Sequence, residues 1–407
     1  MAEQDRPLQY SDSGVNYDLM DPFKIACQKA GATTSENIER FQEFGLTVNE
    51  VTYSRGESAF RVRIQTHQPM TFEIAQVIEG LGSENAISQR MYDLMERLKV
   101  AREASQVLGK SFFRGASYDN ASTVFNDLSS SGASPMSYLM FLATGGSEWY
   151  QDEQRYEDLI AGALEACDDT RSTWGGGESQ TLVDMIEPNQ IIMAGASVGL
   201  TLPEYVRYPS ETNIREGLSI VLLETDNPQT NGYTGLRKKC LERLAARMRV
   251  SEKEELAYTY DIGNGQTYGE AILAKSKIAT PIIDGLLLSQ NPIPIEYATH
   301  LSGHAWRKLM RPNSEFTYVL DQIPDPHPIF RLIQDLSQAS TEQMYADYNM
   351  GAYYALLVEP QFALAVTKEA KKHDQKALIA GYVEKGPKRV VIRPVGIEFK
   401  GESLQIR

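Results

Sequence analysis

The stretch SYDNASTVFNDL, residues 117–128, constrains the fold most, because it reads as a helix with two unlike faces. Asp119, Thr123, Asn126 and Asp127 are spaced i, i+4, i+7 and i+8, so an α-helix places them on one side and leaves the apolar residues to pack. Such a polar face is either turned to solvent or placed against a cation. Magnesium binds one or two carboxylates and fills its other positions with water and substrate phosphate, so this face suits a magnesium–phosphate complex.

Two glycine-rich segments favour the phosphate interpretation. Residues 71–78 read as a strand, residues 79–83 (EGLGS) as a turn and residues 85–98 as a helix. Backbone N–H groups in such a turn can approach an anion, and the helix N-terminus adds a positive dipole. The turn has neither the Gly-Lys-Ser/Thr of a Walker A loop nor a full dinucleotide-binding pattern. In the second segment, residues 174–179 (WGGGES), three glycines are followed by an acidic residue and a residue with a hydroxyl group.

Seven short motifs follow one another along residues 10–393. They are Tyr10-Ser11-Asp12-Ser13-Gly14-Val15, Asp119 with Asn126-Asp127, Gly132-Ala133-Ser134-Pro135, Gly176-Gly177-Glu178-Ser179, Thr230-Asn231-Gly232-Tyr233, His300-Leu301-Ser302-Gly303 and Met344-Tyr345 through Asn349-Met350-Gly351. Together, in this order, they resemble the aminoimidazole ribonucleotide synthetases, the phosphoribosylformylglycinamidine cyclo-ligases of the PurM-like superfamily. The chain resembles a divergent branch of that family.

The resemblance implies an α+β fold with two PurM-like domains, each a mixed sheet packed against helices. The expected parts are a mobile arm at residues 1–20, an ATP-binding domain at residues 21–205 and a second domain at residues 206–407. A break in periodicity at residues 202–216, with two prolines, agrees with that boundary. The spacing also predicts one long helix over residues 268–288. Since two first domains pair across a sheet in this family, a homodimer is expected by analogy.

The resemblance also implies roles for particular residues. Catalysis would involve Asp119, Asn126, Asp127 and Glu178, with Mg²⁺ held by Asp119, Asp127 and Glu178. The ATP phosphates would contact Glu79, Gly80, Gly82, Ser83, Glu84, Gly176, Gly177 and Ser179. The substrate would contact Asp12, Asn231, Gly232, His300, Ser302 and Gly303.

The implied reaction belongs to purine biosynthesis and uses ATP as co-substrate. ATP converts the formyl oxygen of formylglycinamidine ribonucleotide into a phosphate leaving group. A nitrogen of the amidine side then attacks that carbon, and loss of phosphate closes the imidazole ring. Phosphoryl transfer depends on positioning and charge neutralisation more than on a dedicated nucleophile, which agrees with the residues found.

Three departures from the family pattern leave other functions open. Glu84 replaces a lysine, Gln229 replaces a histidine, and His304 with Ala305 interrupts a glycine run. The second reading is a nucleotide-binding paralogue that does not turn over this substrate. The third is another enzyme of the superfamily, such as a selenophosphate synthetase. Hydrogenase maturation would require a C-terminal cysteine, whereas this sequence ends Gln405-Ile406-Arg407.

Composition limits the partners and the compartment. The net charge of −14 argues against a nucleic-acid or anionic-membrane surface, which needs a basic patch. Cys27, Cys167 and Cys240 are isolated in the sequence, and no apolar run reaches about 18 residues, so a cytoplasmic protein is expected. His300 and His304 have the i, i+4 spacing of zinc ligands on a helix, but Leu-Ser-Gly between them is poor helix material, so no zinc site is expected.

Overall fold

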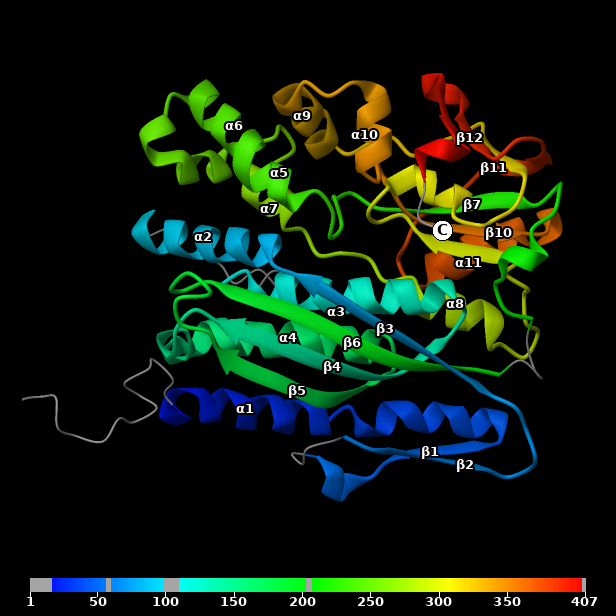
Figure 1. Ribbon diagram of the computed structural model, residues 1–407, viewed down its shortest axis with the longest axis horizontal. Helices are drawn as coiled ribbons and strands as arrows, with labels where there is room; N and C mark the ends of the chain where they lie inside the picture. Colours follow the sequence, from blue (N-terminus) through cyan, green and yellow to red (C-terminus); the bar gives the residue numbers. More distant parts are fainter. Residues whose placement is uncertain (1–16, 56–59, 99–109, 203–206, 405–407) are drawn as a thin grey trace, which may run out of the picture. The chain divides into compact units, whose positions relative to one another are not determined.

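The structure is a computed structural model that describes residues 17–55, 60–98, 110–202 and 207–404. Within this part the chain forms two compact units, which are described separately (Figure 1). Unit 1 comprises the described residues of Met1–His67, Ile78–Asn120 and Ser137–Ala196, and unit 2 those of Gln68–Val77, Ala121–Met136 and Ser197–Arg407. The units interleave along the sequence, whereas the predicted division is a single cut at residue 205.

The predicted N-terminal arm lies only partly within the described residues. Residues 1–16, including Asp12, fall outside them. Residues 17–20, also predicted as arm, instead begin helix α1 (Tyr17–Ala32). Met20 is buried, so this first turn already packs against the unit and is not a free segment.

A four-stranded sheet, most of it in unit 1, organises the first half of the chain. Its strand order is β3-β6-β4-β5, and it is accompanied by helices α1, α2, α3 and α4. The bounds are β3 (Glu73–Leu81), β4 (Ser134–Thr144), β5 (Thr173–Thr181), β6 (Ile191–Thr201), α2 (Ser83–Leu98), α3 (Phe113–Ser130) and α4 (Glu153–Asp169). The predicted helix at residues 117–128 is confirmed as the central part of α3.

Helix α1 protects the edge strand β5. The backbone N–H of Trp174 donates to Thr34 Oγ1 at 2.7 Å, so a loop after the helix satisfies a donor that an exposed edge would leave unpaired. The helix also lies close to the strand, since a Cβ added at Gly31 would come within 2.6 Å of the Trp174 carbonyl oxygen. On the same side, the small sheet of β1 (Leu46–Glu50) and β2 (Val62–Thr66) pairs in antiparallel register.

The first predicted glycine segment has a different local structure from the turn that was expected. Strand β3 runs on to Leu81 and α2 starts at Ser83, so only Gly82 remains of the predicted five-residue turn. The WGGGES segment lies inside strand β5. Gly177 has a packing reason, because a Cβ there would come within 1.8 Å of the Met140 carbonyl oxygen on the neighbouring strand.

We expect Gly177→Ala to destabilise the protein by about 3 kcal/mol, since strand β5 would have to move away from β4. Gly80→Ala is the matched control, because the nearest atoms to a Cβ at Gly80 are 3.8 Å away. That change should cost less than about 1 kcal/mol. Urea unfolding of both variants checks this, and equal midpoints would contradict the packing explanation.

Unit 2 contains a seven-stranded sheet with the order β13-β12-β9-β11-β7-β10-β8. Its strands are β7 (Ser219–Glu224), β8 (Tyr297–His300), β9 (Phe316–Leu320), β10 (Ala352–Val358), β11 (Ala377–Lys385), β12 (Arg389–Ile392) and β13 (Ile397–Lys400). Its helices are α5 (Tyr233–Gly235), α6 (Leu241–Met248), α7 (Tyr268–Ile272), α8 (Thr280–Leu287), α9 (Pro328–Ser337), α10 (Thr341–Asp347) and α11 (Ala363–Lys372). Strand β7 pairs antiparallel with β10 and β11, whereas β12 pairs parallel with β9, so the sheet is mixed.

The core of unit 2 forms where α8 and α11 meet strands β7 and β10. Ile282 and Leu286 of α8 and Val366 of α11 cluster with Val221 and Leu356, all fully or almost fully buried. The β-branched and aromatic residues of these strands favour the extended backbone that this packing uses.

The helix predicted over residues 268–288 is wrong as a single element. Thr267 starts α7 with a capping box, and the helix ends at Ile272. A second helix, α8, begins at Thr280 with Pro281 in its first turn, where the missing N–H of proline costs nothing. Proline inside one continuous helix would have removed a hydrogen bond and clashed with the preceding turn.

None of the described helices is long and apolar enough to cross a membrane.

Candidate functional site

In unit 1, two acidic side chains from different helices meet in the interior. Glu84 is the second residue of α2 and is 1% exposed, and Asp119 of α3 is fully buried. Burial first, and then the charge and hydrogen bond of Asp119, raise the pKa of Glu84 well above its usual range. Two carboxylates in contact cannot both stay charged in a buried site, so the pair either holds a proton or is neutralised by a cation.

Glu178 lies on the opposite face of the four-stranded sheet from this pair. It is the register partner of Phe141 in the parallel pairing of β5 with β4, so both side chains point to the same face. Tyr138, three residues before Phe141, points to the other face and donates to Asn120 Oδ1 of α3 at 2.8 Å. The structure therefore does not bring Glu178 to Asp119, and the register of the strand is the reason.

The structure gathers no three-ligand metal set from the residues it describes. Among them, no group of three or more histidine, cysteine, aspartate or glutamate side chains is close enough to hold a metal ion. The predicted set of Asp119, Asp127 and Glu178 is accordingly absent as a cluster. The carboxylate of Glu178 instead accepts from the backbone N–H of Ser179 at 2.9 Å and is otherwise exposed.

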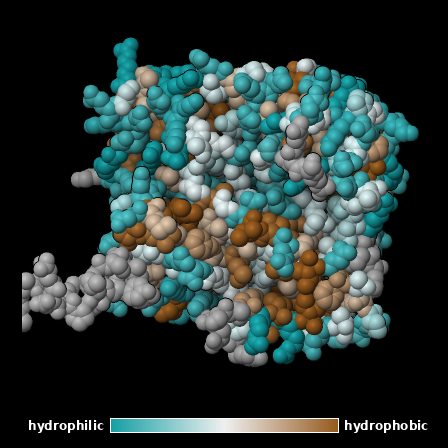
Figure 2. Space-filling model, viewed as in Figure 1, coloured by the Kyte–Doolittle hydropathy of each residue, from teal (hydrophilic) through white to brown (hydrophobic). Residues whose placement is uncertain are grey.

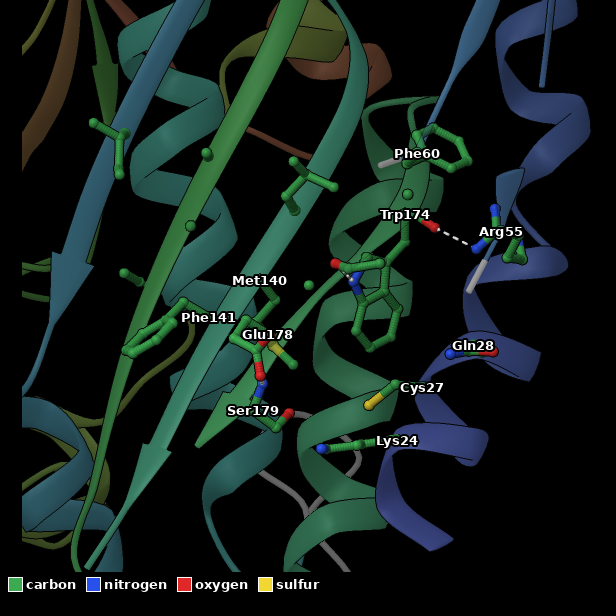
Figure 3. Close-up of a pocket in the computed structure, with 18 of the residues that line it drawn as sticks. Lys24, Cys27, Gln28, Arg55, Phe60, Met140, Phe141, Trp174, Glu178 and Ser179 are labelled. Carbon is green, nitrogen blue, oxygen red and sulfur yellow. Dashed lines mark hydrogen bonds between the residues drawn. The ribbon is translucent and has the colours of Figure 1, made fainter. Parts of the chain in front are cut away.

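A pocket of about 710 Å³ lies on the face of the sheet that carries Glu178 (Figure 3). Its floor includes the apolar side chains of Leu139 and Phe141. Lys24 and Cys27 of α1 line the pocket together with Glu178. Burial raises the pKa of the Cys27 thiol, so the thiol stays protonated and is no nucleophile.

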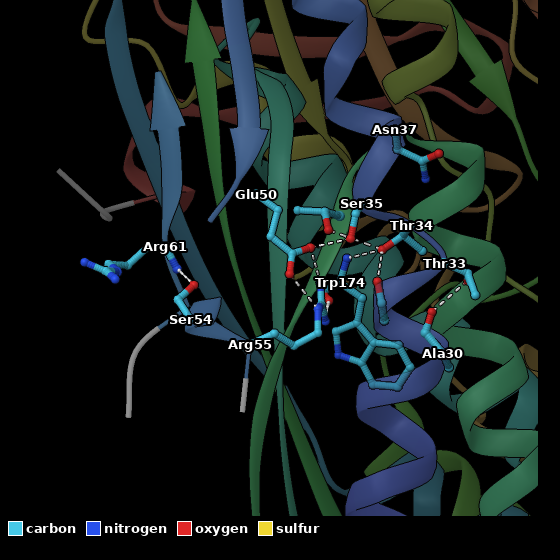
Figure 4. Close-up of polar contacts among 12 residues, drawn as sticks. Ala30, Thr33, Thr34, Ser35, Asn37, Glu50, Ser54, Arg55, Arg61 and Trp174 are labelled. Carbon is cyan, nitrogen blue, oxygen red and sulfur yellow. Dashed lines mark hydrogen bonds and ion pairs between the residues drawn. The ribbon is translucent and has the colours of Figure 1, made fainter. Parts of the chain in front are cut away.

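Arg55 fixes one wall of this pocket (Figure 4). Its guanidinium donates to both carboxylate oxygens of Glu50, at 2.8 and 2.7 Å, and to the Trp174 carbonyl oxygen at 2.9 Å. Burial opposes the ionisation of Glu50, but hydrogen bonds from Arg55 and Ser35 outweigh it and lower the pKa of Glu50. Because Arg55 joins β1 to β5, this wall of the pocket is rigid. No sequence motif indicated the Arg55 contacts.

In unit 2, Asp127 and His300 form a hydrogen-bonded pair. His300 ends strand β8 and is 2% exposed, and its Nδ1 lies 2.8 Å from Asp127 Oδ1. Because a carboxylate only accepts, Nδ1 carries the hydrogen and Nε2 is left as a bare acceptor. Nε2 is buried and has no hydrogen-bond partner among the described residues.

The protonation states of this pair follow from burial and from nearby charges. Burial lowers the pKa of His300, and the hydrogen bond to Asp127 only partly opposes this. Burial works against the charge of Asp127, but His300, Lys308 and Arg311 together hold its pKa below the usual value. At neutral pH the pair is therefore a carboxylate beside a neutral imidazole.

Asn126 positions the segment between α7 and α8. Its Nδ2 donates to the Lys277 carbonyl oxygen at 2.9 Å, and its Oδ1 accepts from the Ala279 N–H at 2.8 Å. This segment is the break in the predicted long helix. Asn126 was predicted to orient phosphate, and the structure shows it holding backbone instead.

The predicted Thr-Asn-Gly motif also meets α3. Thr123 Oγ1 donates to Thr230 Oγ1 at 2.8 Å, which ties the loop before α5 to the polar face of the helix. Asn231 Nδ2 donates to the Asp347 carbonyl oxygen at 2.5 Å. Gly232 has φ +80° and lies where a Cβ would come within 2.4 Å of Tyr348, so only glycine fits.

Gln229, one of the departures from the family pattern, has a structural role. It is buried, and its Nε2 donates to Thr225 Oγ1 at 2.7 Å and to Asn227 Oδ1 at 2.9 Å. Its Oε1 accepts from the Lys277 N–H at 3.2 Å. The glutamine therefore supports the same segment that Asn126 holds.

The loop after His300 carries the remaining predicted substrate residues. Ser302 Oγ accepts a hydrogen bond from Lys308 Nζ at 2.5 Å, and a Cβ at Gly303 would meet nothing within 4 Å. His304 follows in a left-handed conformation with φ +68°. His300 and His304 thus lie on a strand end and in a loop, and they do not share a helical turn.

Comparison with known proteins finds relatives named as phosphoribosylformylglycinamidine cyclo-ligases. No protein-family model matches the chain. The phosphoribosylformylglycinamidine cyclo-ligase of Methanocaldococcus jannaschii is 29% identical over 259 residues, which cover 63% of this chain and 68% of the relative. That of Bacillus pumilus is 27% identical over 290 residues, covering 70% and 76%. That of Staphylococcus epidermidis is 24% identical over 334 residues, covering 79% and 91%.

Solved structures agree on the fold. A crystal structure of the hydrogenase maturation protein HypE matches with a TM-score of 0.53 at 11% identity, covering 84% of this chain and 92% of that one. HypE in complex with ATP matches with a TM-score of 0.53 over 84% and 88%. The chain has a PurM-like fold. At this identity the likeness concerns the fold alone, and it confirms the predicted α+β class.

Within the PurM-like fold, motifs far apart in the sequence meet. The helix α3 supplies Asp119 to unit 1 and Asp127 to unit 2. Asp127 reaches the His-Leu-Ser-Gly motif, and Thr123 reaches the Thr-Asn-Gly motif. The residues of the glycine segments, by contrast, are distributed over β3 with the start of α2 and over β5.

Proposed function

We propose that this chain is an ATP-dependent cyclo-ligase that closes the imidazole ring of formylglycinamidine ribonucleotide to give aminoimidazole ribonucleotide. The observation that carries the proposal is the meeting, in unit 2, of three separately predicted motifs: Asp127 bonds His300, and Thr123 bonds Thr230. The names of the sequence relatives supply the reaction.

The Asp127–His300 pair suits the substrate side of this reaction. Asp127 holds the imidazole so that the lone pair of Nε2 stays available to accept an N–H of the amidine. A neutral imidazole can accept that hydrogen, whereas a protonated one could not. ATP, as co-substrate, supplies the phosphoryl group that turns the formyl oxygen into a leaving group, and the cations of Lys308 and Arg311 near Asp127 suit a phosphate-bearing ligand.

Mg²⁺ is expected with ATP, and the residues of unit 1 fit it in part. Glu84 and Asp119 bring two carboxyl groups together in the interior. Oxygen donors of this kind are what magnesium takes. When bound, the cation would neutralise phosphate charge. In unit 2, Asp127 stays ionised, and its Oδ2 is the oxygen that His300 does not bond.

Phosphate release tests the proposed reaction. Purified protein should release phosphate from ATP when formylglycinamidine ribonucleotide is present and should release little without it. The imidazole product should form in equal amount. Release with an unrelated acceptor, and none with the amidine, would place the chain elsewhere among PurM-like enzymes.

A nucleotide-binding protein without turnover is the second candidate. Glu84 favours this second candidate, because the residue at this position is a buried acid, whereas the family motif has a lysine there. This candidate is supported if calorimetry detects ATP binding but no phosphate is released from ATP with any acceptor.

We further propose a cytoplasmic homodimer that pairs through the outer face of the four-stranded sheet. Ile78, Leu139 and Ile192 are 75%, 40% and 44% exposed on neighbouring strands. Figure 2 shows hydrophobic side chains gathered over the region where Figure 1 draws this sheet. Strand β3 is also an edge strand, because it pairs only with β6 among the described strands. Exposed apolar faces and open edges of this kind favour association.

We expect Ile78→Asp to convert the dimer to a monomer, because a charge would be buried at the centre of the paired faces. Analytical ultracentrifugation should give twice the mass of one chain for the unaltered protein and a single-chain mass for the variant. Leu364→Asp, at a site 64% exposed in unit 2, is the control and should leave the mass unchanged. A monomeric unaltered protein would contradict the proposal.

A further inference from the structure

The loop after His300 keeps a strained turn that exposes an imidazole. His304 and Ala305 both have a left-handed backbone, with φ of +68° and +44°. This backbone costs free energy for any residue with a Cβ, and the resembling family has a glycine run here. Ala305 is fully buried, so packing accounts for its methyl group. The side chain of His304 is exposed and makes no capping hydrogen bond with the short helix that follows. Strain that packing does not explain, beside a candidate site, indicates a role in binding.

This turn is held from both of its ends. Before His304, Ser302 Oγ accepts a hydrogen bond from Lys308 Nζ at 2.5 Å. After it, the buried indole of Trp306 donates from Nε1 to the Asn349 carbonyl oxygen at 2.9 Å. The tip between these two anchors, residues 303 and 304, is exposed. A rigid loop therefore presents the imidazole of His304 in one place.

The loop is positively charged, although the whole chain carries a net charge of −14. Residues 300–314 include Arg307, Lys308 and Arg311 and contain no aspartate or glutamate. Asp347, at the end of α10, faces the loop and lies 3.6 Å from the guanidinium of Arg307, but its side chain is 66% exposed. Solvent screens an exposed acid of this kind. The local charge thus favours an anionic ligand at the tip.

We propose that His304 binds the phosphate monoester of the ribonucleotide substrate, with the open backbone of Gly303 beside it. An imidazole N–H donates to a phosphate oxygen, and nearby cations strengthen such a contact. Four residues separate His304 from His300, so their Cα atoms lie within about 14 Å, a span that suits one ligand reaching both. The inference rests on the proposed function for the identity of that ligand. Since the family pattern has glycine at this position, His304 is a specificity-determining residue of this chain.

Proton NMR of the histidine rings tests the site without turnover. The chain has five histidines, so the ring signals are few, and the one that His304→Gly removes belongs to His304. Ribose 5-phosphate has the sugar and phosphate of the proposed substrate without the amidine. It should shift the His304 signal and raise the pKa of His304, which burial, Arg307 and Lys308 lower in the free protein. Ribose, which lacks the phosphate, should do neither.

The variant separates binding from support of the fold. His304→Gly should weaken ribose 5-phosphate binding, followed by phosphorus NMR, at least tenfold. It should not lower the melting temperature, because glycine adopts a left-handed backbone freely. Gln338→Gly is the matched control, since Gln338 is exposed and has φ +58° at the end of α9. The control should keep the affinity of the unaltered protein.

Three results overturn the proposal. Ribose 5-phosphate leaves the His304 signal unchanged, or His304→Gly keeps the affinity, or Mg·ATP displaces ribose 5-phosphate and so assigns the tip to a nucleotide phosphate. The proposed reaction fails separately. If ribose 5-phosphate binds at His304 but no phosphate is released from ATP with the amidine, the phosphate site stands and the cyclo-ligase does not.

Discussion

Asp127→Asn is expected to weaken Mg·ATP binding by about 10- to 100-fold, about 1.4–2.8 kcal/mol. The asparagine carbonyl oxygen can still accept from His300 Nδ1, so the local geometry is kept while the charge is lost. Asp127 is 23% exposed and Oδ1 bonds His300, which leaves Oδ2 for a cation or its water. The free energy of unfolding should change by less than about 1 kcal/mol.

Calorimetric titration with Mg·ATP and urea unfolding measure the two effects. Asp321→Asn is a suitable control, because it removes the same charge from an exposed ion pair with Arg393 in the same unit. It should leave Mg·ATP affinity unchanged. An unchanged affinity in Asp127→Asn as well would leave the polar face of α3 with a structural role only.

The pH dependence of turnover should reflect the protonation of His300 in the Asp127–His300 pair. Burial lowers the pKa of His300, so the neutral, accepting form persists below the usual histidine range near 6.5. Turnover should therefore hold at pH 6.5 and fall only at lower pH, as Nε2 takes up a proton. In Asp127→Asn the loss of the carboxylate removes a contribution that raises the pKa of His300, so the fall should move to still lower pH. A shift to higher pH would contradict this assignment.

The parts of the fold that could be predicted are those with a clear local period. The polar and apolar faces of residues 117–128 fix a helix, and α3 extends it by four residues before and two after. The glycine run of β5 could not be read correctly, because glycine is required there by the approach of the Met140 carbonyl oxygen from another strand. The break before α8 was readable in principle, since Pro281 marks a helix start.

The candidate site was predictable in its members but not in its pairings. Asp127 and His300 were both expected to be functional, yet a bond across 173 residues has no local signal. Glu178 was predicted to lie with Asp119, but the alternation of side chains along a strand, and not the order of motifs, decides which face of the sheet carries a side chain. Arg55 and Glu50 belong to no motif, so only the fold reveals the wall that they form.

Two substitutions of His300 should separate its possible roles and carry the largest effect on turnover. Asparagine places its amide nitrogen near Nδ1, so His300→Asn keeps a donor for Asp127 and loses the acceptor at Nε2. Glutamine reaches the position of Nε2 with a polar atom but loses the bond to Asp127. If Nε2 contacts the substrate, His300→Asn should lower kcat by at least about 100-fold, about 2.7 kcal/mol, and change Mg·ATP affinity by less than about threefold.

The comparison of these two variants decides between catalysis and support. A contact between Nε2 and the substrate predicts that His300→Gln keeps more turnover than His300→Asn, because a carbonyl oxygen can replace the acceptor. A merely supporting role predicts the reverse order, since only asparagine still holds Asp127. Tyr354 stacks on the imidazole with 6.2 Å between ring centroids, so both variants lose that packing equally and the difference between them reports on hydrogen bonding. Equal turnover in the two variants and the unaltered protein would remove His300 from the site.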